Sequence, residues 1–450
     1  MKSSKKRLPP WRSRMRCLFR IFMVTGFIVQ SILFFEMYSK HPSMLQLDVD
    51  QPQEVDLPAF TVCNLNEVRA SEFCRYYPQK CGNSKTVPDF CTRYVEYCKL
   101  QNGPKMVPII FLEEFNLTRY EQQTFGHQWE DLVVSCVVEI DGNEQNCPGE
   151  PILVPALSHS IQIPFNCFMM FSLYGQPDAV PEKVPRSAVI RLHLNVEVGE
   201  YHPYHLTRGS QISIHSPYHV PSPMSGGQLL NMGNIYRIYL RLAQQNLLPA
   251  PYSSNCTDYM SQWHANGGKG PITQKMCTEK CKLDKSLELY GCAEPRIDYP
   301  HNETMCEKGI PRFHEKARAE CSRQCTMPCK ISTYELQVQI ADSEGQRGSC
   351  VNETDLSCVV LVQIFMENME ITTFTYTPKF EAVGILSWIG GYVGLWLGIS
   401  LLHVYDFLEK WFFYCITSLQ KRSKSLDLVS FLSTLAKTEK NYTYIIDGEN

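Results

Sequence analysis

The residues of this chain that could do chemistry lie in an apolar segment near its C-terminal end. Residues 382–405 contain no Asp, Glu, Lys or Arg. Gly398 would let a helix break or extend within this segment, so that backbone carbonyl oxygens become available, and Ser400 adds a hydroxyl. Oxygen atoms of this kind can replace the hydration water of a small cation. Two acids, Asp406 and Glu409, follow just beyond, where interfacial carboxylates are ordinary.

The length of this segment predicts a membrane span. Its 24 residues make a helix of about 36 Å, enough to cross a hydrocarbon core of about 30 Å with some tilt. Glycines in an apolar span favour either an anchor that packs closely against neighbours or a pore-lining helix. The segment contains five of them, Gly384, Gly390, Gly391, Gly394 and Gly398.

A second apolar segment lies close to the N-terminus. Residues 1–16 hold seven Lys or Arg and no acid, and residues 17–38 follow with only Arg20 and Glu36 charged. The 15 residues between these charges make about 22 Å of helix, so both side chains must reach the membrane interfaces. A cleavable signal peptide is the alternative, but residues 34–38 lack the small side chains that its cleavage requires. We therefore expect an uncleaved span.

Basic residues flank both apolar segments, which predicts the topology. Lys410, Lys421, Arg422 and Lys424 follow the second segment, and the positive-inside rule then places both termini in the cytosol. The sequence thus predicts a multi-pass plasma-membrane protein. Its parts would be a cytosolic N-terminus (1–16), a transmembrane helix (17–38), an extracellular domain (39–380), a second transmembrane helix (381–405) and a cytosolic C-terminus (406–450).

Cysteine is the most informative residue type between the two segments. Of 20 cysteines, 18 lie between Cys63 and Cys358, and none forms a C-x-x-C pair. This disfavours zinc ribbons and redox motifs and favours extracellular disulfides, whose connectivity stays open. The densest cluster, in which a spacing of four suggests one helical face, is Cys277, Cys281, Cys292, Cys306, Cys321, Cys325 and Cys329. Candidate glycosylation sequons in the same region are Asn116, Asn255, Asn302 and Asn352.

Composition and motif searches exclude several functional classes. Lys and Arg number 43 against 46 Asp and Glu, a net charge of −3, so nucleic acid is not an expected partner. Charged residues at 20% and aromatics at 11% exclude a disordered chain. The sequence has no G-x-S-x-G, H-E-x-x-H or G-x-x-x-x-G-K-[ST] motif. We expect no enzyme, no metal site and no cofactor.

The extracellular region carries signals of both strands and helices. Apolar residues alternate with polar ones over 190–198 and 334–340, and residues 358–365 form an apolar run, which predicts strands. Helical patterns cover 113–135 and 310–325. The predicted fold class is α+β, stapled by disulfides and tethered to the membrane at both ends.

Four motifs along the chain have counterparts in one known protein family. They are residues 57–66 (LPAFTVCNLN), residues 212–221, residues 248–256 before the cysteine-rich cluster, and Gly390-Gly391 through Ser400 with its Gly-x-Ser. Together they resemble the degenerin/epithelial sodium channel superfamily, which includes the acid-sensing channels. The resemblance covers nearly the whole chain.

The resemblance implies a trimer with a palm, thumb and finger type of ectodomain. It would be a sodium-selective, amiloride-sensitive channel, gated by an extracellular stimulus. Its partners would be other subunits of the family, the lipid bilayer and an unidentified extracellular ligand or matrix, with Na⁺ as the permeant ion. Cys63 and the seven cysteines of the cluster, which resembles the family's thumb, are the disulfide candidates, with their pairing open. The implied site residues are Gly398, Ile399 and Ser400 (selectivity filter), Ser387, Trp388, Gly391 and Gly394 (pore and gate), Asp406 and Glu409 (attraction of cations to the inner mouth) and Tyr252 (coupling of thumb to membrane).

Two departures from the family pattern keep an alternative open. Trp388 stands where acid-sensing members carry an Asp, and no His-Gly pair precedes the first span, since the first histidine is His41. We expect a truncated or divergent start, or altered gating. The alternative function is a non-conducting auxiliary subunit or surface receptor. ATP-gated trimeric receptors share the topology but typically have about ten ectodomain cysteines, against 18 here.

The gating stimulus is open at this stage. Five histidines lie within 27 residues, and extracellular histidines can sense pH near 6.5. Ordinary loop and strand-surface histidines are the commoner interpretation. The five are His193, His202, His205, His215 and His219.

Overall fold

The computed structural model divides the chain into two compact units. One comprises residues 1–42 and 378–450, and the other comprises residues 43–377. We call them the membrane unit and the ectodomain, and each is described by itself. The structure describes residues 10–93, 98, 106–109, 117–156, 165–201, 208–294, 296–306, 315–342, 359–367, 369–400 and 402–417.

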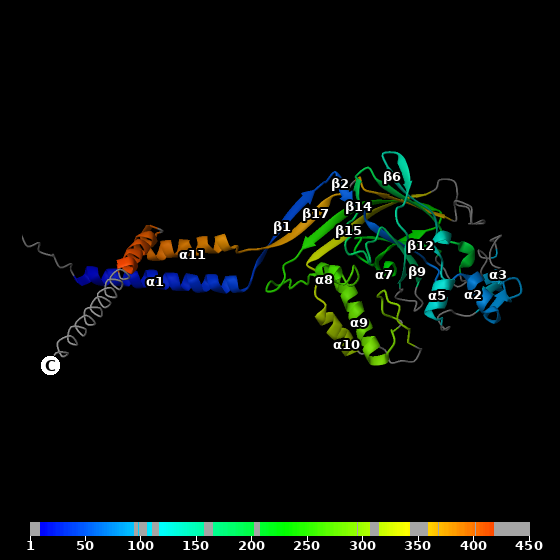
Figure 1. The fold of residues 1–450 in the computed structure, drawn as a ribbon, viewed down its shortest axis with the longest axis horizontal. Coiled ribbons are helices and arrows are strands. Elements are labelled where there is room, and N and C mark those ends of the chain that lie inside the picture. The colour runs from blue at the N-terminus through cyan, green and yellow to red at the C-terminus, as the bar shows by residue number, and fades with distance from the viewer. Residues whose placement is uncertain are drawn as a thin grey trace, which may run out of the picture. The chain divides into compact units, whose positions relative to one another are not determined.

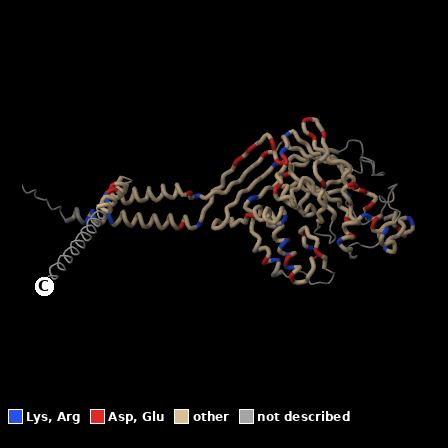
Figure 2. The backbone as a smooth tube through the Cα atoms, in the orientation of Figure 1, with Lys and Arg blue, Asp and Glu red and all other residues tan. Residues whose placement is uncertain are grey.

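The described residues of the membrane unit form three helices, two of which lie side by side (Figure 1). They are α1 (Pro10–Ser39), α11 (Ala382–Leu397) and a further helix over Leu402–Thr417. Charged residues occur only near the ends of α1 and α11 (Figure 2). Within the described residues, α1 is long and apolar enough to cross a membrane by itself, and α11 with the following helix qualifies only if the bent pair counts as one span.

Within the described residues, the ectodomain is built on two larger β-sheets and two small two-stranded sheets. The larger sheet has the order β1-β17-β14-β16-β11-β6-β7, with β15 on β14, and the smaller one has the order β13-β12-β3-β9-β8. The strands of the larger sheet are β1 (Ser43–Asp50), β6 (Val133–Ile140), β7 (Asn143–Asn146), β11 (Val189–Asn195), β14 (Asn234–Asn246), β15 (Lys330–Asp342), β16 (Val359–Phe365) and β17 (Ile371–Pro378). The strands of the smaller sheet are β3 (Ala59–Asn64), β8 (Ile152–Ala156), β9 (Phe165–Met170), β12 (Gly209–His215) and β13 (Gln228–Asn231). The two-stranded sheets pair β2 (Glu54–Asp56) with β10 (Lys183–Pro185), and β4 (Cys81–Asn83) with β5 (Met106–Pro108).

The main core lies between the two sheets. Phe60 and Val62 of β3 and Ile212 of β12 join Ile190 of β11 and Ile238 of β14 in one buried cluster. The predictions over 334–340 and 358–365 are confirmed by β15 and β16, and the prediction over 190–198 is confirmed by β11 only as far as Asn195, because Glu197 is left-handed and η3 (Val198–Glu200) follows. Alternation worked as a signal in β11 because one face of that strand is buried and the other is more exposed.

The helices of the ectodomain agree less well with the sequence prediction. The predicted helix over 113–135 is wrong over its last residues, because β6 begins at Val133, and the described part is split into α5 and α6 with Gly126 in extended conformation between them. The prediction over 310–325 is confirmed in part by α10. The helices are α2 (Ala70–Tyr76), η1 (Pro78–Lys80), α3 (Phe90–Arg93), α5 (Arg119–Phe125), α6 (Trp129–Leu132), η3 (Val198–Glu200), α7 (Pro223–Gly226), α8 (Tyr259–Ala265), α9 (Gln274–Tyr290) and α10 (Glu315–Gln324).

Eight disulfides staple the described part of the ectodomain. Two of them, Cys277–Cys325 and Cys281–Cys321, join α9 to the α10 segment, a connectivity that the sequence left open. The other six are Cys63–Cys167, Cys74–Cys81, Cys91–Cys98, Cys136–Cys147, Cys256–Cys329 and Cys292–Cys306. All eight disulfide candidates named from the sequence are therefore paired. Cys350 and Cys358 lie outside the described residues.

Candidate functional site

The second apolar segment is divided into two helices at the predicted filter. Gly398 has a φ of 66° in the left-handed region and ends α11, with its N–H donating to the carbonyl of Gly394 at 3.1 Å. Ile399 and Ser400 are outside any helix, and the next helix begins at Leu402 at an angle of 91° to α11. The segment predicted as one helix over 381–405 therefore has non-helical backbone at the Gly-x-Ser motif.

Ser400 makes the hydrogen bonds that begin the helix after this break. Its backbone carbonyl accepts from the N–H of Val404 at 3.2 Å, and its hydroxyl lies 2.7 Å from Nδ1 of His403. The N–H of His403 approaches the same hydroxyl oxygen at 3.4 Å. Ser400 thus caps the start of the Leu402–Thr417 helix, which holds the hydroxyl close to the break.

A stripe of small residues runs along α11 toward this break. Gly384, Ser387, Gly391 and Gly394 recur three or four residues apart and share one face. A methyl group built at Gly384 or Gly391 would meet nothing within 4 Å. Close packing inside this chain therefore does not explain those glycines, and the stripe is available to line a pore or to receive another helix.

A different face of α11 packs on α1. Trp388 and Tyr392 contact Phe34, with ring centroids 6.2 and 6.0 Å apart, and Phe380 adds an edge contact at 5.4 Å. Phe34 is only 9% exposed. Trp388 consequently belongs to the contact with α1 and borders the stripe.

The predicted gate residue lies in a shallow apolar hollow on α11. The hydroxyl of Ser387 is tied back to the carbonyl of Val383 at 2.9 Å, so it costs little in an apolar setting. The hollow has a volume of about 430 Å³ and is lined by Ser387, Trp388, Gly391, Tyr392 and Leu395. A large side chain at position 387 would fill it.

The two acids predicted for the inner mouth lie on the helix that follows the break. Asp406 and Glu409 are three residues apart on one face, and both are exposed. Neither carboxylate has a partner among the described residues. Both keep their charge available to solvent at that end of the membrane unit.

A family model confirms the resemblance seen in the sequence. The model described as "Amiloride-sensitive sodium channel" matches residues 5–409. This chain belongs to the amiloride-sensitive sodium channel family. It is 23% identical over 398 residues to Acid-sensing ion channel 4-B of Danio rerio, covering 83% of this chain and 66% of that protein.

Other members of the amiloride-sensitive sodium channel family match more locally. Degenerin mec-4 of Caenorhabditis briggsae is 24% identical over 246 residues, covering 49% of this chain and 31% of that protein. The epithelial sodium channel subunit beta of Xenopus laevis is 21% identical over 322 residues, covering 63% and 47%. The chain therefore spans between about a third and two thirds of the length of these relatives.

Helices α9 and α10, which the resemblance assigns to a thumb, are held together by two disulfides, and Tyr252 lies nearby in the sequence. Tyr252 lies in the loop from β14 to α8 and is half-buried. The loop is fixed at its ends, because the N–H of Leu247 donates to Cys329 and Cys256 is bonded to Cys329. The coupling role of Tyr252 stays a prediction. Of the sequons, Asn255 and Asn302 are exposed, and Asn116 and Asn352 lie outside the described residues.

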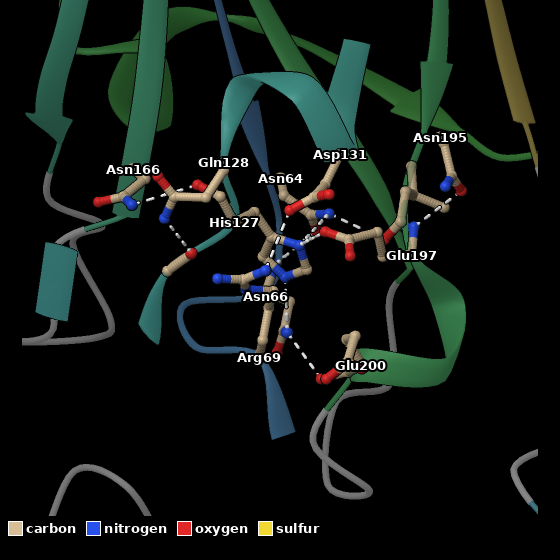
Figure 3. A network of polar contacts seen from close by, with 12 residues as sticks. Asn64, Asn66, Arg69, His127, Gln128, Asp131, Asn166, Asn195, Glu197 and Glu200 are labelled. Carbon is tan, nitrogen blue, oxygen red and sulfur yellow. Dashed lines mark hydrogen bonds and ion pairs between the residues drawn. The ribbon is translucent and has the colours of Figure 1, made fainter. Parts of the chain in front are cut away.

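A buried polar network in the ectodomain was not recognised from the sequence (Figure 3). His127 is 1% exposed and its Nδ1 contacts the carboxylate of Glu197. Its Nε2 lies 2.8 Å from Nδ2 of Asn66, which also donates to the carbonyls of Val68 and Glu200 at 2.8 and 2.9 Å. Nδ2 of Asn66 carries two hydrogens, which these three acceptors share. The network joins the end of β3, the α5–α6 junction and the end of β11.

The amino-acid sequence contained only a weak signal for this network. Asn64 and Asn66 stood inside the motif at residues 57–66, but nothing in that motif names a partner at position 127. Burial is what makes the partners necessary, because a buried amide or imidazole without hydrogen bonds costs stability. That burial depends on the packing of segments more than 60 residues apart.

The structure argues against pH sensing by two of the five clustered histidines. Burial lowers the pKa of His215 to about 3, with His219 adding repulsion, and burial lowers the pKa of His219 to about 4, with Lys275 adding repulsion. Both stay neutral near pH 6.5, so the sequence-based suggestion is wrong for them. His202 and His205 lie outside the described residues.

Proposed function

We propose that this chain is a subunit of a trimeric, sodium-selective cation channel of the plasma membrane that amiloride blocks. An extracellular stimulus acting on the ectodomain would open it, and both termini would face the cytosol. The observation that carries the proposal is the break of the second apolar segment at Gly398–Ser400, inside a chain whose family model spans residues 5–409. Non-helical backbone at membrane depth is tolerated where it lines a water-filled path or is buried in protein.

The chemistry of conduction follows from three copies around one axis. Carbonyl oxygens freed from helical hydrogen bonding at Gly398 and Ile399, with the Ser400 hydroxyl, would replace water around Na⁺. The glycine stripe of α11 would line the path above this ring. Asp406 and Glu409 would raise the local cation concentration at the inner mouth, because two unpaired carboxylates attract cations.

The gate in this proposal lies at Ser387, with Gly391 and Gly394 below it. A small side chain lets three α11 helices approach closely, and a bulky one would hold them apart. Trp388 borders the gate and would affect how amiloride blocks the channel. Tyr252 would carry motion from the thumb toward the membrane, and Asn255 and Asn302 would carry glycans on the extracellular side.

The first test is whole-cell current from Ser387→Phe with confirmed surface expression. A constitutive inward current that disappears when a large organic cation replaces sodium, and that amiloride reduces, would support the proposal. Leu386→Phe is the matched control, because it adds bulk at the neighbouring exposed position outside the stripe. Silence of Ser387→Phe at the cell surface would favour a non-conducting auxiliary subunit or surface receptor instead.

A further inference from the structure

Trp396 of α11 sits in a seat made by three residues of α1. Phe22, Gly26 and Gln30 recur every four residues and so face α11 along one line. The ring of Phe22 meets the indole edge-on at 6.1 Å, and Nε1 of Trp396 donates to Oε1 of Gln30. All four residues lie in the apolar parts of their helices.

Each part of this seat needs the others. A methyl group on Gly26 would lie 2.3 to 2.7 Å from three carbon atoms of the indole, so only glycine fits against the ring. The indole N–H would cost free energy in hydrocarbon without an acceptor, and so would the amide of Gln30 without a partner. Their mutual hydrogen bond removes much of that cost and fixes where Trp396 can lie along α1.

Trp396 lies close to the proposed selectivity filter, so its packing on α1 can affect the filter. It lies two residues before Gly398, where α11 ends and the non-helical filter segment begins. A side chain seated this close to the end of a helix restrains both the rotation of the last turn and its height along α1. The carbonyls of Gly398 and Ile399 and the hydroxyl of Ser400 inherit that restraint, because only Leu397 separates Trp396 from Gly398, the first of the three.

We infer that Gly26 and Gln30 are positioning residues for the selectivity filter, acting through Trp396. The inference rests on the proposed function and deepens it, since it assigns to α1 a part in ion discrimination. An ion-selective ring depends on the spacing of its oxygen atoms. Loosening the seat would therefore relax discrimination between Na⁺ and K⁺ while leaving a pore.

The electrical test uses the Ser387→Phe chain as the conducting background. Gln30→Leu and Trp396→Phe each delete one side of the hydrogen bond while keeping most of the side-chain volume. Each is expected to lower the Na⁺/K⁺ permeability ratio about three- to tenfold, the equivalent of one net hydrogen bond, and the double variant should fall no further than either single one. Thr25→Val, a polar-to-apolar change at an exposed position of the same helix, should leave the ratio unchanged.

A second measurement needs no current. Gly26→Cys with Trp396→Cys, in a chain whose Cys17 and Cys415 are replaced by Ser, should be joined within one chain by a short bifunctional thiol reagent. The matched pair Thr25→Cys with Trp396→Cys should not be joined. Absence of cross-linking in the first pair would overturn the seat itself.

The outcomes separate the two proposals. If the Ser387→Phe background carries no current at the surface, the channel function fails and the filter role fails with it. If it conducts and cross-linking succeeds, unchanged reversal potentials in Gln30→Leu and Trp396→Phe would overturn the positioning role alone. Additive losses in the double variant would do the same, because they would mean that the two residues act separately.

Discussion

The side-chain amide of Asn66 lies 2.8 Å from Nε2 of His127, and both side chains are at most 2% exposed. The same amide nitrogen donates to the carbonyls of Val68 and Glu200. One asparagine amide thus contacts the histidine ring and the backbone of two other segments. His127 in turn reaches Glu197, whose backbone is in the left-handed region with a φ of 46°.

Replacing Asn66 with Ala should destabilise the ectodomain strongly. The change removes an amide whose two hydrogens are shared among the carbonyls of Val68 and Glu200 and Nε2 of His127. Each buried acceptor that loses its donor costs roughly 1–3 kcal/mol. We expect a clear fall in the thermal unfolding temperature of the purified full chain and less protein at the cell surface. Asn143→Ala, at an exposed position of β7, is the control and should behave as the parent does.

Stability should fall as pH falls below 6.5, in part because of His215 and His219. The hydroxyl of Thr61 donates to Nε2 of His215 at 2.8 Å, and Nδ1 donates to the carbonyl of Ser216 at 2.9 Å. With pKa values of about 3 and about 4 in the folded chain, these two histidines take up protons between those values and pH 6.5 only on unfolding. In that window the unfolded state binds more protons, so stability rises with pH.

The measurement is thermal unfolding of the full chain between pH 7 and pH 5. His215→Gln with His219→Gln should flatten the dependence on pH, although it lowers stability at pH 7. His264→Gln, at an exposed position on α8, is the control. An equally steep dependence in the double variant would contradict the assignment.

Alternation of apolar and polar residues reveals a strand when one of its faces is buried and the other is more exposed. Ile190, Leu192 and Leu194 of β11 are buried, and the residues between them are less so. The fully buried strands β3 and β9 have no alternation to detect. Alternation therefore identified β11 and could give no signal for β3 and β9.

Pairings between distant residues had no signal in a single sequence. The spacing of Cys277, Cys281 and Cys321 indicated helical faces, but many pairings of that cluster satisfy the spacing equally. Only the antiparallel approach of α9 and α10 selects Cys281–Cys321. The seat of Trp396 is the same kind of case, because Gly26 and Gln30 are ordinary residues of an apolar helix until α11 lies against them.

Removing the Cys281–Cys321 disulfide between α9 and α10 should cost more stability than removing a disulfide that closes a short loop. Cys281–Cys321 closes a separation of 40 residues and Cys74–Cys81 closes one of 7. In the chain-entropy model the double Cys→Ser variants lose about 4 and about 2.5 kcal/mol respectively. Thermal unfolding and surface abundance of the two double variants, compared in parallel, measure the difference. A larger loss for Cys74→Ser with Cys81→Ser would mean that native packing outweighs loop entropy.

Gly398→Ala should damage conduction where Gly390→Ala does not. Gly398 has a φ of 66°, and the left-handed region costs a residue with a Cβ roughly 1–2 kcal/mol. Gly390 is helical, and a methyl group there meets nothing within 4 Å. In the Ser387→Phe background, we expect Gly398→Ala to reduce the current or its preference for sodium at unchanged surface abundance. Equal currents and reversal potentials in the two alanine variants would mean that the left-handed backbone at Gly398 does not shape the path of the ion.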